Sequence, residues 1–498
     1  MSASPPDRSE PATTRRLSLA GLVGGLVGAA VLLALPAPAG LSAAGWHCAV
    51  VGLVMATWWI TEAIPIPATA LVPLAAFPLL GVADIDATAR PYANPIIFLF
   101  LGGFLLALAM QRHGLHRRLA LAIVAAVGSG PRRIVLGFVL ATGFLSMWVS
   151  NTATAMMMLP IAVSVTGLAA AGEARGRAFA TALVLAIAYG ANVGGLGTLI
   201  GTPPNALLAG FLRETQGVEI GFAQWLAFGL PLVGLGLPLV FAVLIRCYPL
   251  RGLTLAGGAD AIAARRRELG PVSGPEITVA VVFGLVAAAW IAAPLLTAYV
   301  PGLSDAGIAM AGALLLFVLP AQRQPWQPVL DWEVAADLPW GVLLLFGGGL
   351  SLAAGVQDTG LADYIGHLLG GLDQLPLVLV MLAACATILL LTELTSNTAT
   401  TAAFLPVLAA LAIGLGENPL TLAVPAALAA SCAFMLPVAT PPNAIAFGSG
   451  HVSLPQMART GLWLNIGFLV LITALVYSLL PLVFGVVFGQ VPAWASRP

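Results

Sequence analysis

Long apolar runs fill most of the chain, and each is about as long as one membrane-spanning helix. About 20 apolar residues are enough for a helix to cross the hydrocarbon core of a bilayer. The pattern therefore predicts an all-α integral membrane protein with about 11 such spans. The predicted spans lie near residues 17–36, 44–61, 66–82, 94–111, 178–198, 222–245, 276–299, 306–320, 340–357, 418–438 and 461–486.

Two further apolar runs are about twice as long as one span, and each has a polar centre. Residues 131–168 contain "SMWVSNTAT", and residues 375–414 contain "TELTSNTAT". Such a run is either two complete spans or a re-entrant hairpin, in which two half-length helices meet inside the membrane. Non-helical backbone at that depth is tolerated where it is buried in protein or lines a wet cavity.

The placement of arginine decides between these alternatives, because loops on the cytoplasmic side are enriched in basic residues. If the Arg-rich loops all face the cytoplasm, the spans alternate consistently, with the N-terminus inside and the C-terminus outside. Arg90, Arg213 and Arg497 are exceptions. The alternation requires residues 131–168 to enter and leave on the cytoplasmic side, and residues 375–414 on the outer side. We therefore expect two re-entrant hairpins from opposite faces.

Three motifs occur twice, in the same order. "GGFLLALAMQRHGL" at residues 102–115 matches "GGLSLAAGVQDTGL" at residues 348–361, a shift of 246 positions. The same shift carries Ser150-Asn151-Thr152 onto Ser396-Asn397-Thr398, and "GTPPNA" from residue 201 returns as "ATPPNA" from residue 439. An odd number of predicted spans separates the copies, so the repeat is inverted. Inverted repeats with broken helices are typical of secondary transporters.

The composition agrees with a membrane protein. Only 8% of the 498 residues are charged, whereas soluble domains carry about 25%. The formal net charge is zero, which gives no electrostatic argument for a nucleic-acid partner. The start of the chain, with Arg15 and Arg16 before an apolar run, also fits a signal peptide. Because the run from Leu17 to Leu35 is nearer to spanning length, we interpret it as the first span, preceded by a disordered cytoplasmic tail at residues 1–14.

The TPPN motifs are candidate cation sites. Paired prolines lack N–H groups and end a helix. Pro203-Pro204 would leave the carbonyls of Leu199 and Ile200 unpaired, and Pro441-Pro442 repeats the pattern. A bound cation satisfies such carbonyls in unwound transporter helices. The alternative is a proline kink with a purely structural role.

The SNT motifs offer donors and acceptors together. The amides of Asn151 and Asn397 can turn oxygen to a cation and NH₂ to an anion. A helix that starts at the motif adds free N–H groups. Since no arginine lies near either motif, the pattern favours a dianion neutralised by co-bound sodium. The alternative is polar contact between helices.

Two carboxylates in apolar surroundings are further candidates, because charged groups at membrane depth are often functional. Glu62 either has such a role or lies at the end of a span. Glu393 stands one helical turn before Asn397, where the first repeat has Met147. It either supports a cation site, is protonated or bonds a neighbouring helix. The polar segment at residues 331–340 is interpreted as interfacial structure.

The paired SNT and TPPN motifs, "TEAIPIPATAL" and "LTELTSNTAT" resemble the divalent anion:sodium symporter family, from about Trp58 to Asn465. The resemblance implies a homodimer in the bilayer, with a scaffold and a moving transport domain that work as an elevator. It implies sodium as the coupling ion and a small dianion as substrate. The implied first sodium site comprises Ser146, Ser150, Asn151 and the Gly201 carbonyl; the second comprises Thr392, Thr395, Asn397 and the Ala439 carbonyl. The implied substrate residues are Ser150, Asn151, Thr152, Thr202, Pro203, Ser396, Asn397, Thr398, Thr440 and Pro441.

The resulting layout has scaffold helices at residues 15–92 and 216–338, the latter with a cytoplasmic loop at 246–273. Transport parts lie at 93–215, with a broken helix at 178–214, and at 339–452, with a broken helix at 418–450. Residues 453–498 hold the last helix.

The expected function is sodium-coupled symport of a C4-dicarboxylate of the succinate, malate or fumarate type across the cytoplasmic membrane. Sodium-independent exchange and sulfate transport are the alternatives within the family. A membrane enzyme would need paired aspartates or an HExxH motif, and the sequence contains neither pattern in its apolar segments. Two opposed hairpins argue against a continuous channel.

Overall fold

The computed structural model describes residues 12–167, 174–255, 258–368 and 375–495, and these are almost entirely helical. In chain order the elements are α1 (Ala12–Ala34), α2 (Ala43–Thr61), α3 (Ile66–Thr69), α4 (Val72–Leu79), α5 (Ile85–Ala89), η1 (Arg90–Ala93), α6 (Pro95–Arg112), α7 (Leu115–Val127), α8 (Pro131–Ser146), α9 (Asn151–Thr166), α10 (Ala174–Gly195), α11 (Pro203–Gln216), α12 (Phe222–Cys247), α13 (Gly258–Glu268), α14 (Gly274–Leu296), α15 (Asp305–Val318), the antiparallel strands β1 (Pro320–Arg323) and β2 (Trp326–Pro328), α16 (Trp332–Ala335), α17 (Trp340–Asp358), α18 (Leu361–Leu368), α19 (Leu377–Thr392), α20 (Asn397–Gly414), α21 (Leu420–Ala430), η3 (Pro437–Ala439), α22 (Pro441–Gly448) and α23 (Leu454–Phe484).

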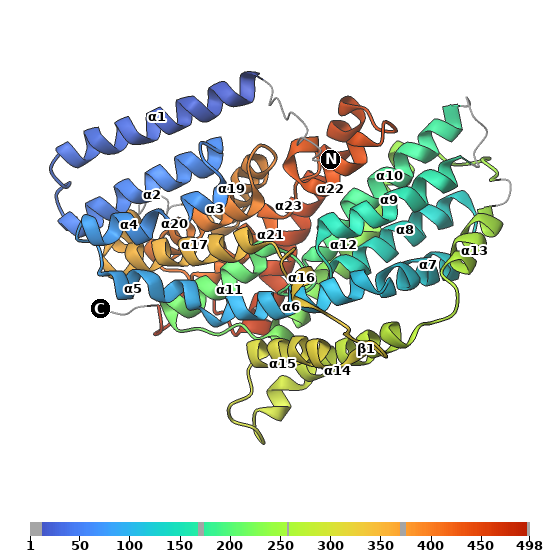
Figure 1. The fold of residues 1–498 in the computed structure, drawn as a ribbon. Helices are drawn as coiled ribbons and strands as arrows, with labels where there is room; N and C mark the ends of the chain where they lie inside the picture. The colour runs from blue at the N-terminus through green and yellow to red at the C-terminus, as the bar shows by residue number, and fades with distance from the viewer. Residues whose placement is uncertain (1–11, 168–173, 256–257, 369–374, 496–498) are drawn as a thin grey trace.

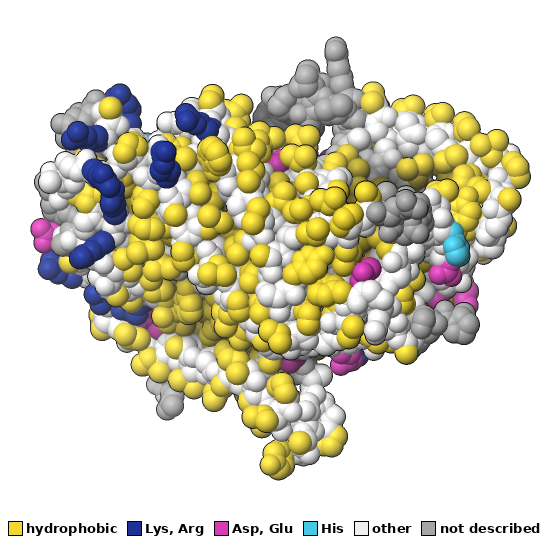
Figure 2. All heavy atoms as spheres, turned by 180° about the vertical axis from the view of Figure 1, so that it is seen from behind, with side chains coloured by type: hydrophobic (Ala, Val, Ile, Leu, Met, Phe, Trp, Pro, Cys, Tyr) yellow, Lys and Arg dark blue, Asp and Glu magenta, His cyan; other side chains and the backbone are white. Residues whose placement is uncertain are grey.

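Eight helices in the described residues are long and apolar enough to cross a membrane: α2, α10, α12, α14, α17, α20, α23 and the segment Ile85–Arg112 that ends with α6. The chain is therefore a multi-pass membrane protein. Figure 2 shows hydrophobic side chains over most of one face, with arginines gathered toward one edge.

Three sequence expectations need correction. The predicted span at residues 66–82 is two short helices, α3 and α4, because the chain turns at Ala70, whose carbonyl accepts the Tyr92 hydroxyl at 2.5 Å. The predicted tail reaches too far, since α1 begins at Ala12; residues 1–11 lie outside the described part. The predicted loop at 246–273 contains the helix α13, whose last turn is basic.

Each long run with a polar centre folds into two helices joined by a tight turn. α8 and α9 meet at a tip formed by residues 147–150, and α19 and α20 meet at residues 393–396. α8 and α9 have 16 residues each, so each is about 24 Å long, shorter than a ~30 Å hydrocarbon core. Neither helix alone is long enough to span such a core.

The two halves repeat the same packing. α10 lies against α8 and α9, and α21 lies against α19 and α20. The halves also exchange their last short helices: α22 packs on α9 and α10, whereas α11 packs on α20 and α21. In Figure 1, α7 to α10 and α12 run side by side at one end of the molecule, and α11, α21 and α23 lie near its middle. Both SNT tips are thus carried by helices that meet at the centre.

Glycines allow the closest contact between two of these helices. A Cβ added to Gly194 on α10 would stand 2.1 Å from the Gly143 carbonyl oxygen on α8. Real Cβ atoms do not come that near to backbone, so α8 and α10 touch directly at these glycines. Glycine at helix interfaces lets backbones approach in this way in membrane proteins. The contact fixes the first tip relative to α10.

Candidate functional site

The first hairpin tip is organised by its own SNT residues. Ser150 caps α9, since its Oγ accepts the Ala153 N–H at 3.3 Å. Asn151 Oδ1 accepts a short hydrogen bond from the hydroxyl of Ser146, the last residue of α8. A side-chain bond therefore crosses the tip and holds the amide oxygen beside a second oxygen.

The second tip repeats this geometry 246 positions later. Ser396 Oγ accepts the Ala399 N–H at 3.4 Å, and Thr392 Oγ1 donates to Asn397 Oδ1 at 2.5 Å. Thr395 donates instead to the Leu391 carbonyl at 2.8 Å, within its own hairpin. If Thr395 serves a cation site, this contact leaves its backbone carbonyl for that role.

Each SNT tip faces a helix that is interrupted. α10 ends at Gly195 and α11 begins at Pro203, so residues 196–202 form a first break. α21 ends at Ala430 and α22 begins at Pro441, so residues 431–440 form a second break. The prediction that the paired prolines end a helix was wrong. They occupy the first turn of α11 and of α22, where a missing N–H costs nothing.

The asparagine of each TPPN motif clamps its break, a role that the sequence reading missed. Asn205 Nδ2 donates to the carbonyls of Gly195 at 3.2 Å and Thr198 at 2.8 Å. Asn443 Nδ2 donates to the carbonyls of Ala433 at 3.1 Å and Leu436 at 3.0 Å, which the repeat places at the equivalent positions. The position of this asparagine in the motif could have indicated the role, because an amide three residues into a helix can reach back to the turn before it.

Three of the four residues of the implied first sodium site come together around Gly195: Ser146, Asn151 and Gly201. A Cβ at Gly195 would lie 2.9 Å from Asn151 Oδ1 and 3.0 Å from the Gly201 carbonyl oxygen. Ser146 bonds the same Asn151 oxygen. Three oxygens from the tip and the first break therefore surround a spot that only a glycine leaves open. Oxygens of this type suit a sodium ion at an unwound helix.

The implied second site is held by Thr392. Its hydroxyl contacts the Ala430 carbonyl at 2.7 Å as well as Asn397, which ties the second tip to the end of α21. Ala439, whose carbonyl is the remaining expected ligand, is buried in the second break. Thr392 thus joins the second tip to the end of α21, and Ala439 lies in the break that follows this helix.

The threonines expected to line the substrate join the two breaks. Thr202 Oγ1 lies 3.3 Å from Ser431 Oγ, and Thr440 Oγ1 accepts the Asn192 amide at 3.2 Å. Thr152 and Thr398 are half-buried in the first turns of α9 and α20. Pro203 and Pro441 begin α11 and α22. The predicted substrate residues therefore belong to four helix starts that surround the two breaks.

Glu393 breaks the symmetry of the repeat. Its carboxylate is buried and accepts the N–H groups of Phe434 at 2.8 Å and of Met435 and Leu436 at 3.0 Å. Asn465 on α23 donates to it at 2.8 Å. A carboxylate that faces only donors serves as an acceptor. Of the alternatives left open, the structure supports bonding to a neighbouring helix, here together with the second break.

The other singled-out acidic residues are structural. Glu62 is exposed and ends α2 in the left-handed region, with φ of 48°. Asp331, in the polar segment 331–340, caps α16 and pairs with Arg112 at 2.6 Å. The N–H of Val334 and the Arg112 guanidinium hold the pKa of Asp331 below its usual range. Neither residue contacts a tip or a break.

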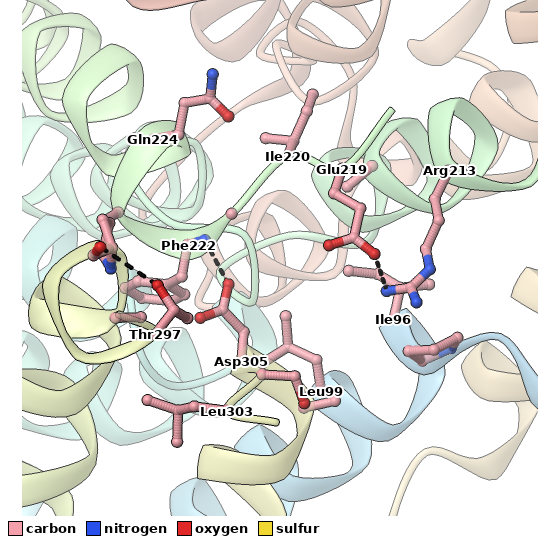
Figure 3. A pocket seen from close by; sticks show the side chains of 18 residues that line it. Ile96, Leu99, Arg213, Glu219, Ile220, Phe222, Gln224, Thr297, Leu303 and Asp305 are labelled. Carbon is pink, nitrogen blue, oxygen red and sulfur yellow. Dashed lines mark hydrogen bonds and ion pairs between the residues drawn. The ribbon is translucent and has the colours of Figure 1, made fainter. Parts of the chain in front are cut away.

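A cavity of about 420 Å³ lies apart from this site, among α6, α11, α12, α14 and α15. Figure 3 shows its polar groups: Asp305 accepts the Phe222 N–H at 2.6 Å, and Arg213 pairs with Glu219 at 3.0 Å. No SNT or TPPN residue lines it. The candidate site is therefore the meeting point of tips and breaks, not this cavity.

Comparisons with known proteins place the chain in a transporter family. The family described as the sodium:sulfate symporter transmembrane region matches residues 17–485. The sodium-dependent dicarboxylate transporter SdcS of Staphylococcus saprophyticus is 45% identical over 480 residues, which cover 94% of this chain and 92% of that protein. SdcS of Staphylococcus aureus strain USA300 is 43% identical over 462 residues, 90% of this chain and 88% of that protein.

Two solved structures share the fold at low identity. MtrF of Neisseria gonorrhoeae, from a class titled antimetabolite efflux pumps, has a TM-score of 0.56 and 14% identity, covering 94% of this chain and 95% of that one. The YdaH transporter of Alcanivorax borkumensis has a TM-score of 0.55 and 15% identity, covering 95% and 98%. On the family match and the close relatives, the chain belongs to the divalent anion:sodium symporter family that its paired motifs resemble.

Proposed function

We propose that this protein is a secondary active transporter that couples sodium entry to uptake of a C4-dicarboxylate, such as succinate, malate or fumarate. The carrying observation is that Asn151 and Asn397 present their amide oxygens in the same way, each bonded by a hydroxyl five residues earlier. Sodium-dependent dicarboxylate transporters with 43–45% identity support the choice of ion and substrate.

The sodium ions would sit between each tip and its break. Ser146, Ser150, Asn151 and the Gly201 carbonyl would hold the first ion, and the contacts around Gly195 support this set. Thr392, Thr395, Asn397 and the Ala439 carbonyl would hold the second. Uncharged oxygens on both sites leave the ions' positive charge available to offset a dianion.

The substrate would lie between the tips. α9 and α20 begin at Asn151 and Asn397, and the N-terminus of a helix attracts anions through its free N–H groups and its dipole. Asn151 and Asn397 Nδ2, with Thr202 and Thr440, would add donors. Sodium ions beside the same tips would neutralise the two carboxylates, so an arginine is not needed.

The mechanism would be an elevator. Both hairpins would be re-entrant, in an inverted repeat, with the N-terminus inside and the C-terminus outside the cytoplasmic membrane. The moving part would include α12 and α23, because α12 packs on α8 and α10 and α23 packs on α19 and α21. This differs from the expected layout, which gave α12 to the scaffold. The remaining helices of the scaffold would form a homodimer.

Uptake of labelled succinate into proteoliposomes tests the proposal. We expect uptake to require an inward sodium gradient, and Asn151→Ala and Asn397→Ala each to weaken sodium dependence. Unlabelled fumarate should compete, whereas unlabelled sulfate should not. Sodium-independent uptake that needs internal dicarboxylate would establish exchange instead, and strong competition by sulfate would shift the substrate class.

A further inference from the structure

Asn192 is a buried polar residue that lies between the two proposed sodium sites without belonging to either. It stands on α10, one turn before that helix ends at Gly195, and its side chain is 1% exposed. The repeat places Ala430 at the equivalent position, 238 residues later. The fold of a broken helix therefore does not itself require an amide here.

The Asn192 amide reaches across to the second repeat. Its Nδ2 lies 3.2 Å from each of three acceptors: the Ala433 carbonyl, Thr440 Oγ1 and Asn443 Oδ1. The amide has two hydrogens, so the three acceptors share them. All three belong to the second break or to the first turn of α22. A residue of the first broken helix thus donates hydrogen bonds to the second broken helix.

The same turn of α10 touches both proposed sodium sites. Gly195, about 4.5 Å further along the helix axis, stands against Asn151 and the Gly201 carbonyl of the first site. Thr440, bonded by Asn192, directly follows Ala439, whose carbonyl is a proposed ligand of the second ion. One helical turn therefore connects the ligands of both ions.

Packing alone does not explain an amide at this point. Asn192 Oδ1 is buried and has no hydrogen-bond partner in the described part of the chain. An unpaired buried acceptor destabilises a fold. An alanine, as at position 430, would avoid this cost. The donors of Asn192 must therefore contribute something that the second break needs.

We propose that Asn192 is a positioning residue that couples the two sodium sites. This rests on the proposed function. Sodium in the first site fixes the tip and the first break against the end of α10. Through Asn192 the second break is then already ordered when the second ion arrives, so that ion binds more tightly. Coupling of this kind is reciprocal, and each ion helps the other to bind.

The test is the sodium dependence of succinate uptake by Asn192→Ala and Asn192→Asp, measured with sodium chloride replacing choline chloride. Asn192→Asp keeps the side-chain size but loses the donors that face three acceptors. For both variants we expect the half-saturating sodium concentration to rise about 5- to 150-fold, and the Hill coefficient to fall toward about 1. The maximal rate at saturating sodium should change far less.

Thr181→Ala is the matched control. Thr181 is a buried residue of the same helix, and its hydroxyl also contacts the second half, at the His451 carbonyl, 2.8 Å away. It lies three turns from Asn192, away from both breaks. The Thr181→Ala variant, which lacks this hydroxyl, should keep the sodium cooperativity of the wild type. Thermal unfolding midpoints in detergent, measured for all variants, show that each one is folded.

Two results would overturn the proposal, and a third would refute the function on which it rests. Folded Asn192 variants that keep the wild-type Hill coefficient and lose only maximal rate would assign Asn192 a structural role. An equal loss of cooperativity in Thr181→Ala would make the effect a general property of α10. Wild-type uptake that ignores sodium would instead refute the proposed function, and is recognised before any variant is made.

Discussion

Replacing Glu393 by glutamine should loosen the second break, because one carboxylate gathers the break and α23 around itself. Oε1 faces the N–H groups of Phe434 and Met435 and the Asn465 amide, and Oε2 faces those of Met435 and Leu436. Glutamine keeps one oxygen. Its NH₂ would point at N–H groups that also need an acceptor.

The expected loss of folding stability follows from these contacts. Hydrogen bonds to a charged group contribute about 1.5–3 kcal/mol, and a buried donor left without an acceptor costs about 1–3 kcal/mol. Glu393→Gln removes the bond to Leu436 and leaves that N–H unpaired, while the remaining bonds lose their charge. We expect a destabilisation of about 3–6 kcal/mol, at or above the upper end of ordinary substitutions.

The assay combines stability with sodium dependence. The thermal unfolding midpoint in detergent should fall, and the half-saturating sodium concentration for uptake should rise, because Ala439 lies in the same break. Glu417→Gln is the control. Glu417 accepts a single backbone N–H, from Gly489 at 2.8 Å, near the surface, so the change should be within about 0.5 kcal/mol. A Glu393→Gln protein with wild-type midpoint and sodium dependence would refute the reasoning.

The remaining predictions address the first site and the clamps. Gly195→Ala should abolish sodium-dependent uptake, because its Cβ would lie 2.9 Å from Asn151 Oδ1. The control is Gly234→Ala, whose Cβ would meet no neighbouring residue within 4 Å and which should transport normally. Equal activity of the two variants would contradict the proposed first site. Asn443→Asp should lower both stability and sodium affinity, since a carboxylate cannot donate to the two carbonyls that Asn443 holds. Wild-type sodium titrations and unfolding midpoints for Asn443→Asp would show that the clamp is dispensable.

The sequence predicts the elements of this site better than their boundaries. Two runs with polar centres do fold as helix–turn–helix units, and two helices are broken before TPPN. These features follow from local chemistry: Ser caps a helix, and paired prolines fit only its first turn. The sequence misplaced the start of each break, because α10 stops at Gly195 for a tertiary reason. Gly194 and Gly195 pack against the Gly143 carbonyl and Asn151, residues far away in the chain.

The roles that sequence reasoning missed are those of side chains that bond across elements. Asn192 does not belong to a sequence motif, and its amide finds its partners only in the folded protein, where α22 lies beside α10. Glu393 was noticed as an asymmetry, but its backbone donors lie 41 to 43 residues further along the chain and Asn465 lies 72 residues further. A hydropathy pattern reports which faces are apolar. It does not report which loop reaches a given carboxylate.

The two breaks are supported in different ways, and this bears on where an anion binds. In the first break, the N–H groups of Leu196 and Gly197 bond the carbonyls of Val193 and Gly194, three residues earlier. In the second, three consecutive N–H groups turn toward the Glu393 carboxylate. Successive N–H groups that converge in this way form a concave anion site.

That anion site is already filled by the protein's own carboxylate. A substrate carboxylate therefore cannot use the N–H groups of Phe434, Met435 and Leu436, and in the first break the N–H groups of Leu196 and Gly197 are already paired with backbone carbonyls. The donors proposed for a dianion are the N–H groups at the starts of α9 and α20, the amides of Asn151 and Asn397, and the hydroxyls of Thr202 and Thr440. We infer that Glu393 has a second consequence besides stability: it fills the anion site formed by these three N–H groups and leaves recognition of the substrate's charge to the two tips and to Thr202 and Thr440.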